Sequence, residues 1–304
     1  MNRKPFSTVT SAVCAALTLF CIGGGGVMSA QAVTAIPVHD LEIEQVTGLY
    51  GNLRIDTTRV TADDISDLSG FAREPFTYGD GPCASDLYRP ERKGASLRVR
   101  DVGTWIDLHG ESHGIDMIVT VEDYLAPADF RIMYNSCSPD GVDLAHPAGF
   151  GPTAGLAGRP AADGRRAFID FTIRLVRADG GPTDGIMGVT GFRDIDGNTA
   201  TPNEAWELVS GFDGAWLRSD AHLTEYGENG WAGVTDEYQD PDMESTHALQ
   251  HYLGATFTGD TFRLRYSVMQ GDSRGSQLSP LNGTVLYPLA YDLNGGAGTI
   301  PNEP

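Results

Sequence analysis

The fold class of this chain is decided by one stretch, Ala167-Phe168-Ile169-Asp170-Phe171-Thr172-Ile173-Arg174-Leu175. Its odd-numbered positions are Ala, Ile, Phe, Ile and Leu, whereas Asp170, Thr172 and Arg174 stand on the opposite side. A period of two separates apolar from polar side chains on the two faces of an extended strand. The stretch therefore predicts a strand that is buried on one face and exposed to water on the other.

The same alternation recurs on both sides of this stretch. Residues 115–121 place Ile, Met, Val and Val opposite Asp and Thr, with Ile118 as the exception, and residues 262–268 alternate Phe, Leu, Tyr and Val with Arg, Arg and Ser. The segment 256–258 precedes 261–262 across Gly259-Asp260, which predicts a hairpin. Shorter strands are predicted at 96–102, 130–134, 186–192, 206–209, 215–218 and 231–234.

Helical periodicity is nearly absent between these strands. The 38 glycines and 17 prolines favour turns, and the one helix candidate is 241–252, with Asp240 as N-cap and Gly254 as stop. Many short strands separated by turn residues predict an all-β fold. The expected architecture is an antiparallel β-sandwich, jelly-roll or Ig-like, with long loops and at most one or two short helices.

The chain is acidic and long enough to bury a sizeable core. It has 304 residues, with 21 Lys and Arg against 41 Asp and Glu, and a formal net charge of -20. Hydrophobic residues make up 40% of the sequence, which is too many for a disordered acidic tail. The negative charge repels nucleic acid and anionic membrane surfaces, so neither is a predicted partner.

The N-terminus has the pattern of an export signal. Arg3 and Lys4 precede an apolar run over 13–22, and Ala30-Gln31-Ala32 matches a small-residue cleavage pattern. Residues 1–32 are therefore predicted to be a signal peptide, whose removal leaves a secreted or extracellular protein without membrane insertion. An uncleaved anchor and a lipoprotein signal at Cys21 are the alternatives, which the short, glycine-broken run and the bulky Phe20 disfavour.

Two cysteines remain after this cleavage, Cys83 and Cys137. An even number of cysteines in an oxidising compartment predicts a single disulfide between them. A reactive thiol and a metal ligand are the alternatives, although neither cysteine has a second Cys or a His at ligand spacing.

The rest of the chain is predicted to contain one main domain. Residues 96–290 form the sandwich in this interpretation, and residues 33–95 are either an N-terminal extension or its first strands. Residues 138–165 are rich in Gly, Pro and Ala, and are predicted to be a long loop.

The C-terminus carries the first of two family resemblances. Tyr291-Asp292-Leu293-Asn294-Gly295-Gly296-Ala297-Gly298-Thr299-Ile300-Pro301 resembles the opening strand and turn of the Listeria–Bacteroides repeat, a β-grasp-like module of the internalin B type. The resemblance implies that residues 291–304 are the truncated start of such a repeat, with a Gly-rich tail as the alternative. It also implies cell-wall association through a C-terminal region beyond residue 304.

Three motifs between residues 96 and 291 resemble the β-sandwich modules of large Gram-positive surface proteins and adhesins. They are Val102-Gly103-Thr104-Trp105, the strand 115–121, and Gly191-Phe192-Arg193-Asp194-Ile195-Asp196-Gly197. The resemblance implies an adhesin-like binding or stalk module without catalytic activity, whose partner is a host or cell-wall protein or a glycan. A carbohydrate-binding module and a secreted glycan-active hydrolase are the alternative functions.

One motif offers ligands for a hard cation. Asp194, Asp196 and Asn198 carry oxygen ligands at alternate positions, and Glu204 is available to complete a site for Ca²⁺. The pattern is not an EF-hand, because its fourth residue rather than its sixth is Gly and its twelfth is Ala. Calcium is the only cofactor that the sequence suggests, and a solvated Asp-Gly turn is the alternative interpretation.

The histidines and tryptophans suggest weaker alternatives. A metal site is the alternative to surface histidines for two pairs. His247 and His251 are four residues apart on the candidate helix, and His109 and His113 have the same spacing beside Gly110 and Gly114, where a loop is expected. A sugar-stacking platform is the alternative to core packing for Trp105, Trp206, Trp216 and Trp231. No catalytic residue is predicted, because neither the carboxylates nor the serines of the sequence form a distinctive catalytic arrangement.

Overall fold

The structure is a computed structural model, and the residues that it describes all belong to one compact unit, Val33–Pro304. Among them, no helix is long and apolar enough to cross a membrane. The described residues are 35–41, 51–55, 60, 62–77, 84–125, 129–135, 150–155, 167–193, 195, 197, 204–234, 249–268, 274–275 and 277–279.

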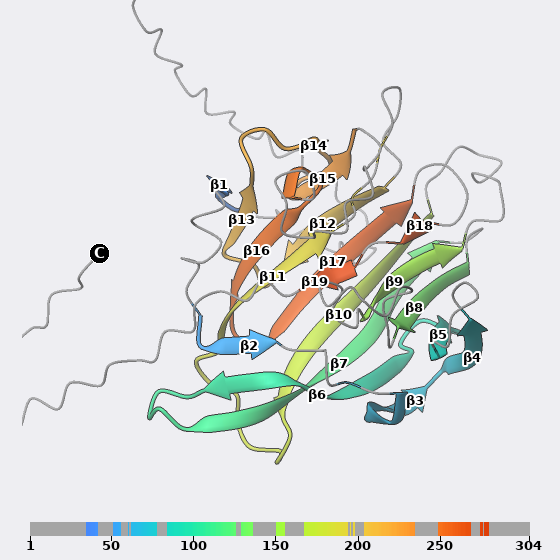
Figure 1. The fold of residues 1–304 in the computed structure, drawn as a ribbon, viewed down its shortest axis with the longest axis vertical. Coiled ribbons are helices and arrows are strands. Elements are labelled where there is room, and N and C mark those ends of the chain that lie inside the picture. The colour runs from blue at the N-terminus through green and yellow to red at the C-terminus, as the bar shows by residue number, and fades with distance from the viewer. Residues whose placement is uncertain are drawn as a thin grey trace, which may run out of the picture. The chain divides into compact units, whose positions relative to one another are not determined.

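Two β-sheets make up this unit (Figure 1). The order in the 10-stranded sheet is β1 (Val38–Asp40), β13 (Gly214–Leu217), β16 (Leu253–Thr258), β11 (Met187–Arg193), β19 (Gln277–Ser279), β9 (Phe150–Gly155), β8 (Asp129–Asn135), β5 (Ala84–Pro90) and β4 (Phe71–Thr77), with β18 (Arg274–Gly275) paired to β9. The order in the 9-stranded sheet is β14 (Leu223–Glu225), β15 (Gly230–Gly233), β12 (Glu204–Ser210), β17 (Thr261–Val268), β10 (Ala167–Arg177), β7 (Ser112–Leu125), β6 (Ser96–Ile106) and β2 (Leu53–Ile55), with β3 (Ile65–Ser69) paired to β6. A short 3₁₀ turn, Ala62–Asp64, precedes β3.

The two sheets pack face to face around a shared apolar core. Ile169 and Phe171 of β10 are buried in this core, whereas Arg174 on the other face is exposed. Trp206 of the 9-stranded sheet stacks on Phe192 of the 10-stranded sheet, with ring centroids 4.3 Å apart. The predicted all-β sandwich is therefore confirmed.

Strands that follow one another in the chain are distributed between the two sheets. β10 lies between β7 and β17, which come from well before and well after it in sequence. The next strand, β11, lies in the other sheet and pairs with β16 and β19. Within the described residues, every strand pair is antiparallel except that of β1 with β13. Each sheet thus combines pairs of consecutive strands, such as β6 with β7 and β4 with β5, with pairing between distant parts of the sequence.

The hairpin predicted at Gly259-Asp260 is wrong, although both of its strands exist. β16 and β17 lie in different sheets, and the turn carries the chain across the sandwich. The Gly259 backbone has φ +102°, and its N–H donates to the carbonyl of Ile186 at 2.8 Å. Phe257 and Phe262 both face the core, with ring centroids 4.6 Å apart. Alternation identifies the buried face of each strand, but it does not determine which strands pair.

One further segment differs from the sequence-based expectation, whereas residues 33–95 contain strands, which was one of the two alternatives for them. The predicted loop 138–165 contains strand β9, which pairs with β8. Residues 33–95 supply β1 to β5, and these strands pair within both sheets. In the candidate helix, Leu249 and Gln250 are helical, and residues 241–248 lie outside the described residues.

A β-bulge in β6 sets the position of the β6–β7 hairpin that follows it. The register between β6 and β7 shifts between Val99 and Gly103. Asp101 has a φ of 53°, and its N–H donates to the buried carboxylate of Asp116 at 2.9 Å. The backbone of β2, the antiparallel neighbour of β6, lies very close here, because a Cβ on Gly103 would lie 2.1 Å from the carbonyl oxygen of Arg54. The second half of β6 is therefore held between β2 and β7, and it fixes where the β6–β7 turn lies.

Candidate functional site

The turn between β6 and β7 is organised by one carboxylate. Asp107 Oδ1 accepts hydrogen bonds from the backbone N–H groups of His109 at 2.8 Å and Glu111 at 2.9 Å. The Asp107 N–H donates to the Glu111 carbonyl at 2.9 Å, and Gly110 has the positive φ of 81° that the turn requires. The turn thus has a defined conformation with its polar side chains in fixed positions.

His113 lies beside this carboxylate and not in a loop, which corrects the expectation for this residue. It is the second residue of β7, and its Nε2 is 2.9 Å from Asp107 Oδ2. The His113 and Asp107 side chains are only 12% and 16% exposed. The His113 ring also packs on Trp105, its cross-strand neighbour, with ring centroids 5.3 Å apart. Both the position and the orientation of the imidazole are therefore restrained.

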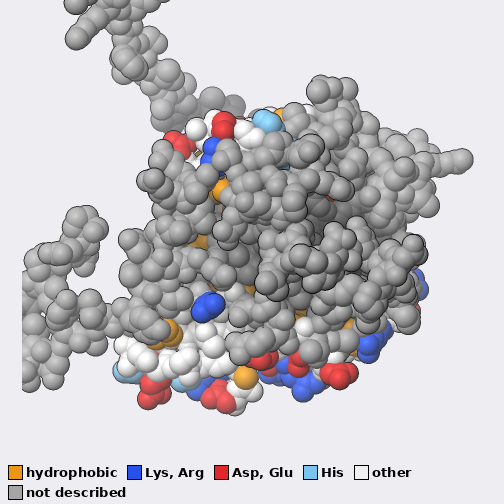
Figure 2. Space-filling model, in the orientation of Figure 1, with side chains coloured by type: hydrophobic (Ala, Val, Ile, Leu, Met, Phe, Trp, Pro, Cys, Tyr) orange, Lys and Arg blue, Asp and Glu red, His pale blue; other side chains and the backbone are white. Residues whose placement is uncertain are grey.

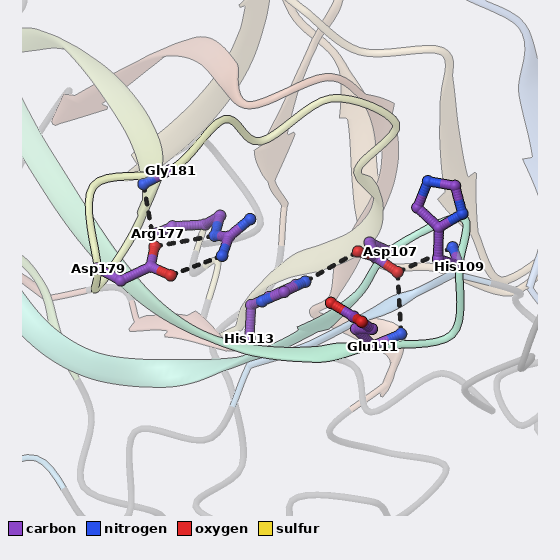
Figure 3. A network of polar contacts seen from close by, with 7 residues as sticks. All are labelled: Asp107, His109, Glu111, His113, Arg177, Asp179 and Gly181. Atoms are coloured by element: carbon purple, nitrogen blue, oxygen red, sulfur yellow. Dashed lines mark hydrogen bonds and ion pairs between the residues drawn. The ribbon is translucent and has the colours of Figure 1, made fainter.

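Glu111 completes a group of three ligand-bearing side chains, which we call the 107–111–113 cluster (Figure 3). One donor atom from each of Asp107, Glu111 and His113 lies within 4.8 Å of the other two. Glu111 is exposed, whereas the other two residues are partly buried. The cluster therefore contains two carboxylates and one imidazole that face one another and remain open to solvent on the Glu111 side.

The loop after β10 lies next to this cluster. The Ala178 N–H donates to the Gly114 carbonyl at 2.9 Å, which fixes the loop beside the start of β7. Arg177 forms a bidentate ion pair with Asp179, with contacts of 2.9 and 2.6 Å, and the Gly181 N–H donates to the same carboxylate. Charged groups of both signs therefore surround the cluster. In Figure 2, acidic, basic and histidine side chains gather along the lower edge of the view, over β6 and β7.

Asn52 connects this end of the two sheets. Its side chain donates to the Gly185 carbonyl and accepts from the Met187 N–H, both at 2.8 Å, and its carbonyl accepts from the Ile106 N–H, also at 2.8 Å. Asn52 is only 3% exposed, so these bonds are shielded from water. The β6–β7 turn and the β10–β11 loop are consequently tied to one rigid base.

Hydrogen bonding sets the acidity of Asp107. The bond with His113, followed by those from the backbone of Glu111 and His109, lowers the pKa of Asp107 from 3.8 to about 2. Because the folded-state pKa lies below the unfolded-state value, the stabilisation from the ionised carboxylate is present above about pH 4 and is lost as the pH falls through about 2.

Removal of the imidazole should reverse much of this shift. We expect the Asp107 carboxyl to titrate near 2 in the wild type and closer to 3.8 in His113→Ala, because the largest cause of the lowered pKa is then absent. Carboxyl ¹³C NMR across the acid range measures both midpoints. Asp220 is the internal control, since Arg218 is the main cause of its lowered pKa and His113 takes no part in it. An unchanged Asp107 midpoint in the variant would contradict this assignment.

The predicted calcium ligands are only partly described. Asp194, Asp196 and Asn198 lie outside the described residues. Glu204 is 1% exposed, and its carboxylate accepts a hydrogen bond from the Tyr266 hydroxyl. The calcium site therefore stays a prediction, and the described member of the set already has a protein hydrogen-bond donor.

Of the other residues singled out in the sequence, most lie outside the described part of the chain, and His251 is described. Cys83, Cys137, His247, the signal segment 1–32 and the C-terminal segment 291–304 lie outside the described residues. His251 is fully buried, and its Nδ1 lies 3.3 Å from the Ile195 carbonyl oxygen. This histidine therefore supports the chain between the two predicted calcium-binding aspartates, and it is not a surface residue.

The tryptophans do not form a platform. Trp105, Trp206 and Trp231 are at most 5% exposed and belong to the core. Trp216 is partly exposed, and His39 of β1 stacks on it with ring centroids 4.5 Å apart. Core packing is therefore the correct interpretation for three of the four.

The 107–111–113 cluster was not predicted from the sequence, because the four-residue spacing of His109 and His113 does not indicate that Asp107 and Glu111 lie beside His113. The signal was the run Asp107-Leu108-His109-Gly110-Glu111-Ser112-His113, in which every second residue is a potential metal ligand. An alternating set of this kind converges only if the chain turns between its members. That turn depends on the pairing of β6 with β7, which is not readable from the run alone.

Comparison with known proteins gives distant matches to solved structures. No protein family model and no curated protein matches this chain. The N-terminal domain of the Streptococcus gordonii adhesin Sgo0707 is 13% identical, with a TM-score of 0.46, over 81% of this chain and 65% of that one. The adhesin domain of PrgB from Enterococcus faecalis, bound to DNA, is 10% identical with a TM-score of 0.47, over 76% and 96%. Glucan binding protein C of Streptococcus mutans is 12% identical with a TM-score of 0.44, over 86% and 83%.

This chain thus spans 65% of the length of the Sgo0707 domain. Identities and TM-scores at this level assign neither a family nor a function to it.

Proposed function

We propose that this chain is an exported, adhesin-like binding module without catalytic activity. The proposal rests on one observation: the β6–β7 turn and the β10–β11 loop lie together at one end of the sandwich. Asn52 and the hydrogen bonds of Asp107 and Asp179 hold these segments in defined conformations. Loops that display charged groups on a rigid β-scaffold are typical recognition surfaces.

The sequence motifs support the same proposal. Two of the three stretches that resemble adhesin modules, 102–105 and 115–121, lie on the adjacent strands β6 and β7. These strands lead directly into the turn that carries the 107–111–113 cluster. The export pattern over residues 1–32 fits a protein that meets its partner outside the cell.

The alternative functions have less support. A carbohydrate-binding platform needs exposed aromatic rings, but three of the four tryptophans are in the core. A glycoside hydrolase needs two carboxylates that flank a bound sugar. The carboxylates of Asp107 and Glu111 do face each other, but they lie on a hairpin tip with Glu111 exposed.

A binding screen tests the proposal. Purified protein is immobilised and presented with a glycan array, host extracellular-matrix proteins, bacterial cell-wall preparations and duplex DNA. We expect saturable binding to a protein or glycan, and none to DNA at physiological salt because of the charge of -20. Arg177→Ala combined with Asp179→Ala should weaken that binding about tenfold, since it removes the ion pair beside the cluster.

The matched control is a second exposed ion pair, Lys93 with Asp123. Lys93 precedes the first residue of β6, so it lies at the far end of that strand from the cluster. Replacing both members of this pair by Ala should leave the affinity unchanged. Equal losses in the two double variants would contradict recognition at the cluster end. Catalytic turnover of a glycan, or failure to bind any member of the panel, would contradict the binding function itself.

A further inference from the structure

We propose that the 107–111–113 cluster binds one divalent first-row transition-metal ion such as Zn²⁺. The inference concerns the cluster's own chemistry and does not depend on the proposed adhesin-like function. It is also separate from the calcium site predicted around Asp194, which involves other residues and a different kind of cation.

The donor set selects the class of metal. Asp107 and Glu111 offer carboxylate oxygens, and His113 offers an imidazole nitrogen. Zinc and its neighbours in the first transition row bind mixtures of imidazole and carboxylate, whereas Ca²⁺ and Mg²⁺ take oxygen ligands. One imidazole with two carboxylates therefore favours a transition metal over an alkaline-earth ion.

The geometry is close to that of a formed site. Donor atoms bound tetrahedrally to zinc at about 2.0–2.1 Å lie about 3.4 Å from one another. The three donors of the cluster already lie within 4.8 Å of one another, and Asp107 Oδ2 is 2.9 Å from His113 Nε2. Metal binding would replace the hydrogen bond between Asp107 and His113, release the proton that this bond holds, and bring in the carboxylate of the exposed Glu111 as the third ligand.

Two of the ligands are held in place by groups outside the set. Asp107 Oδ1 accepts the backbone N–H groups of the turn, which leaves Oδ2 to face His113. The ring of His113 packs on Trp105, which is 3% exposed. Support of this kind orients the ligands before the metal arrives, and it reduces the conformational entropy lost on binding.

The net negative charge of the cluster also favours a bound cation. Two carboxylates face a single imidazole, and the guanidinium of neighbouring Arg177 is engaged by Asp179. Arg177 interacts electrostatically with Asp107 and Glu111, but its hydrogen bonds go to Asp179, so within the described part of the chain the Glu111 carboxylate still has room for a cation of its own. A divalent ion would supply that partner and relieve the repulsion between the two acids.

His109 is not a member of the proposed site, although it belongs to the same turn. Figure 3 shows its ring pointing away from the cluster, while its backbone N–H binds Asp107. Three protein ligands would therefore leave at least one coordination position for water or for a group from a partner.

Titration calorimetry with Zn²⁺, and visible absorption with Co²⁺ as a coloured substitute, tests the proposal on the purified full chain. We expect one ion to bind at this site, with the affinity lowered about tenfold or more in Glu111→Gln and in His113→Asn. His109→Asn is the matched control, because it removes an imidazole from the same turn without removing a proposed ligand. Its affinity should equal that of the wild type, and excess Ca²⁺ should not displace the metal.

Three results would overturn the proposal. They are the absence of Zn²⁺ binding, equal affinity in the wild type and in both ligand variants, and a loss in His109→Asn as large as that in His113→Asn. Far-UV circular dichroism confirms that each variant is folded. If His113→Asn does not fold, Glu111→Gln decides the question alone, because the exposed Glu111 carboxylate takes no part in the hydrogen bonds of the turn.

Discussion

Replacing Trp206 by alanine is expected to lower the free energy of unfolding by about 3–5 kcal/mol. The side chain is fully buried at the centre of the sandwich. It stacks on Phe192 at 4.3 Å and lies edge-on to Phe171 at 5.9 Å, so its removal opens a cavity between the two sheets. Urea denaturation followed by far-UV circular dichroism measures the loss.

Trp216→Ala is the control for the size of the residue. Trp216 is only partly buried, and its indole N–H is 3.4 Å from the hydroxyl of Thr256. It lies beside β1 at the edge of its sheet, where solvent can fill the space that the ring leaves. A much smaller loss is therefore expected. Equal losses in the two variants would contradict the assignment of Trp206 as the central contact between the sheets.

Asp170→Ala is expected to cost about 2–3 kcal/mol, although its side chain lies on the face of β10 away from the core. The carboxylate is 2% exposed and is bound by Arg265 at 2.5 and 2.9 Å and by Arg263 at 2.9 Å. Removing it leaves two guanidinium groups together without their counter-ion. They are 38% and 35% exposed, so water relieves part of the cost and the loss lies at or just below the lower end of the range of about 3–5 kcal/mol for buried pairs.

The comparison is with Asp179→Ala, which breaks an ion pair of similar bidentate geometry. Asp179 is 61% exposed, and exposed pairs contribute about 1 kcal/mol or less. The same urea experiment on both variants separates the effect of burial from that of geometry. If the loss in Asp170→Ala were no larger than that in Asp179→Ala, the three-residue network would not be a stabilising feature of β10.

Strand positions could be predicted from the sequence because alternation is a local property. The stretch 167–175 lies in β10, and 262–268 lies in β17. Pairing could not be predicted, because it depends on neighbours that are distant in sequence. Gly259-Asp260 shows this, since an identical local pattern suits a hairpin and a crossing between sheets. β9 was missed because Phe150 to Gly155 lacks alternation, and its pairing with β8 compensates for that.

The candidate site was less predictable than the fold. His113 was expected in a loop because Gly114 follows it, yet β10 and β7 pair up to Ile115 and the strand continues to Ser112. The ligand set appears only when the β6–β7 register brings Asp107, Glu111 and His113 together. The sequence contains the three ligand-bearing residues, but only the β6–β7 turn brings their side chains together.

The distribution of successive strands between the two sheets has a consequence for how the chain reaches its native state. β10, at the centre of its sheet, is complete only when β17 has added to its side, and β17 ends at Val268. Topologies dominated by such distant pairings fold slowly, on the order of milliseconds to seconds. A chain released or cleaved before Thr261 would leave β10 and β12 without their shared neighbour. The central part of this sheet therefore completes its pairing only after β17 is present.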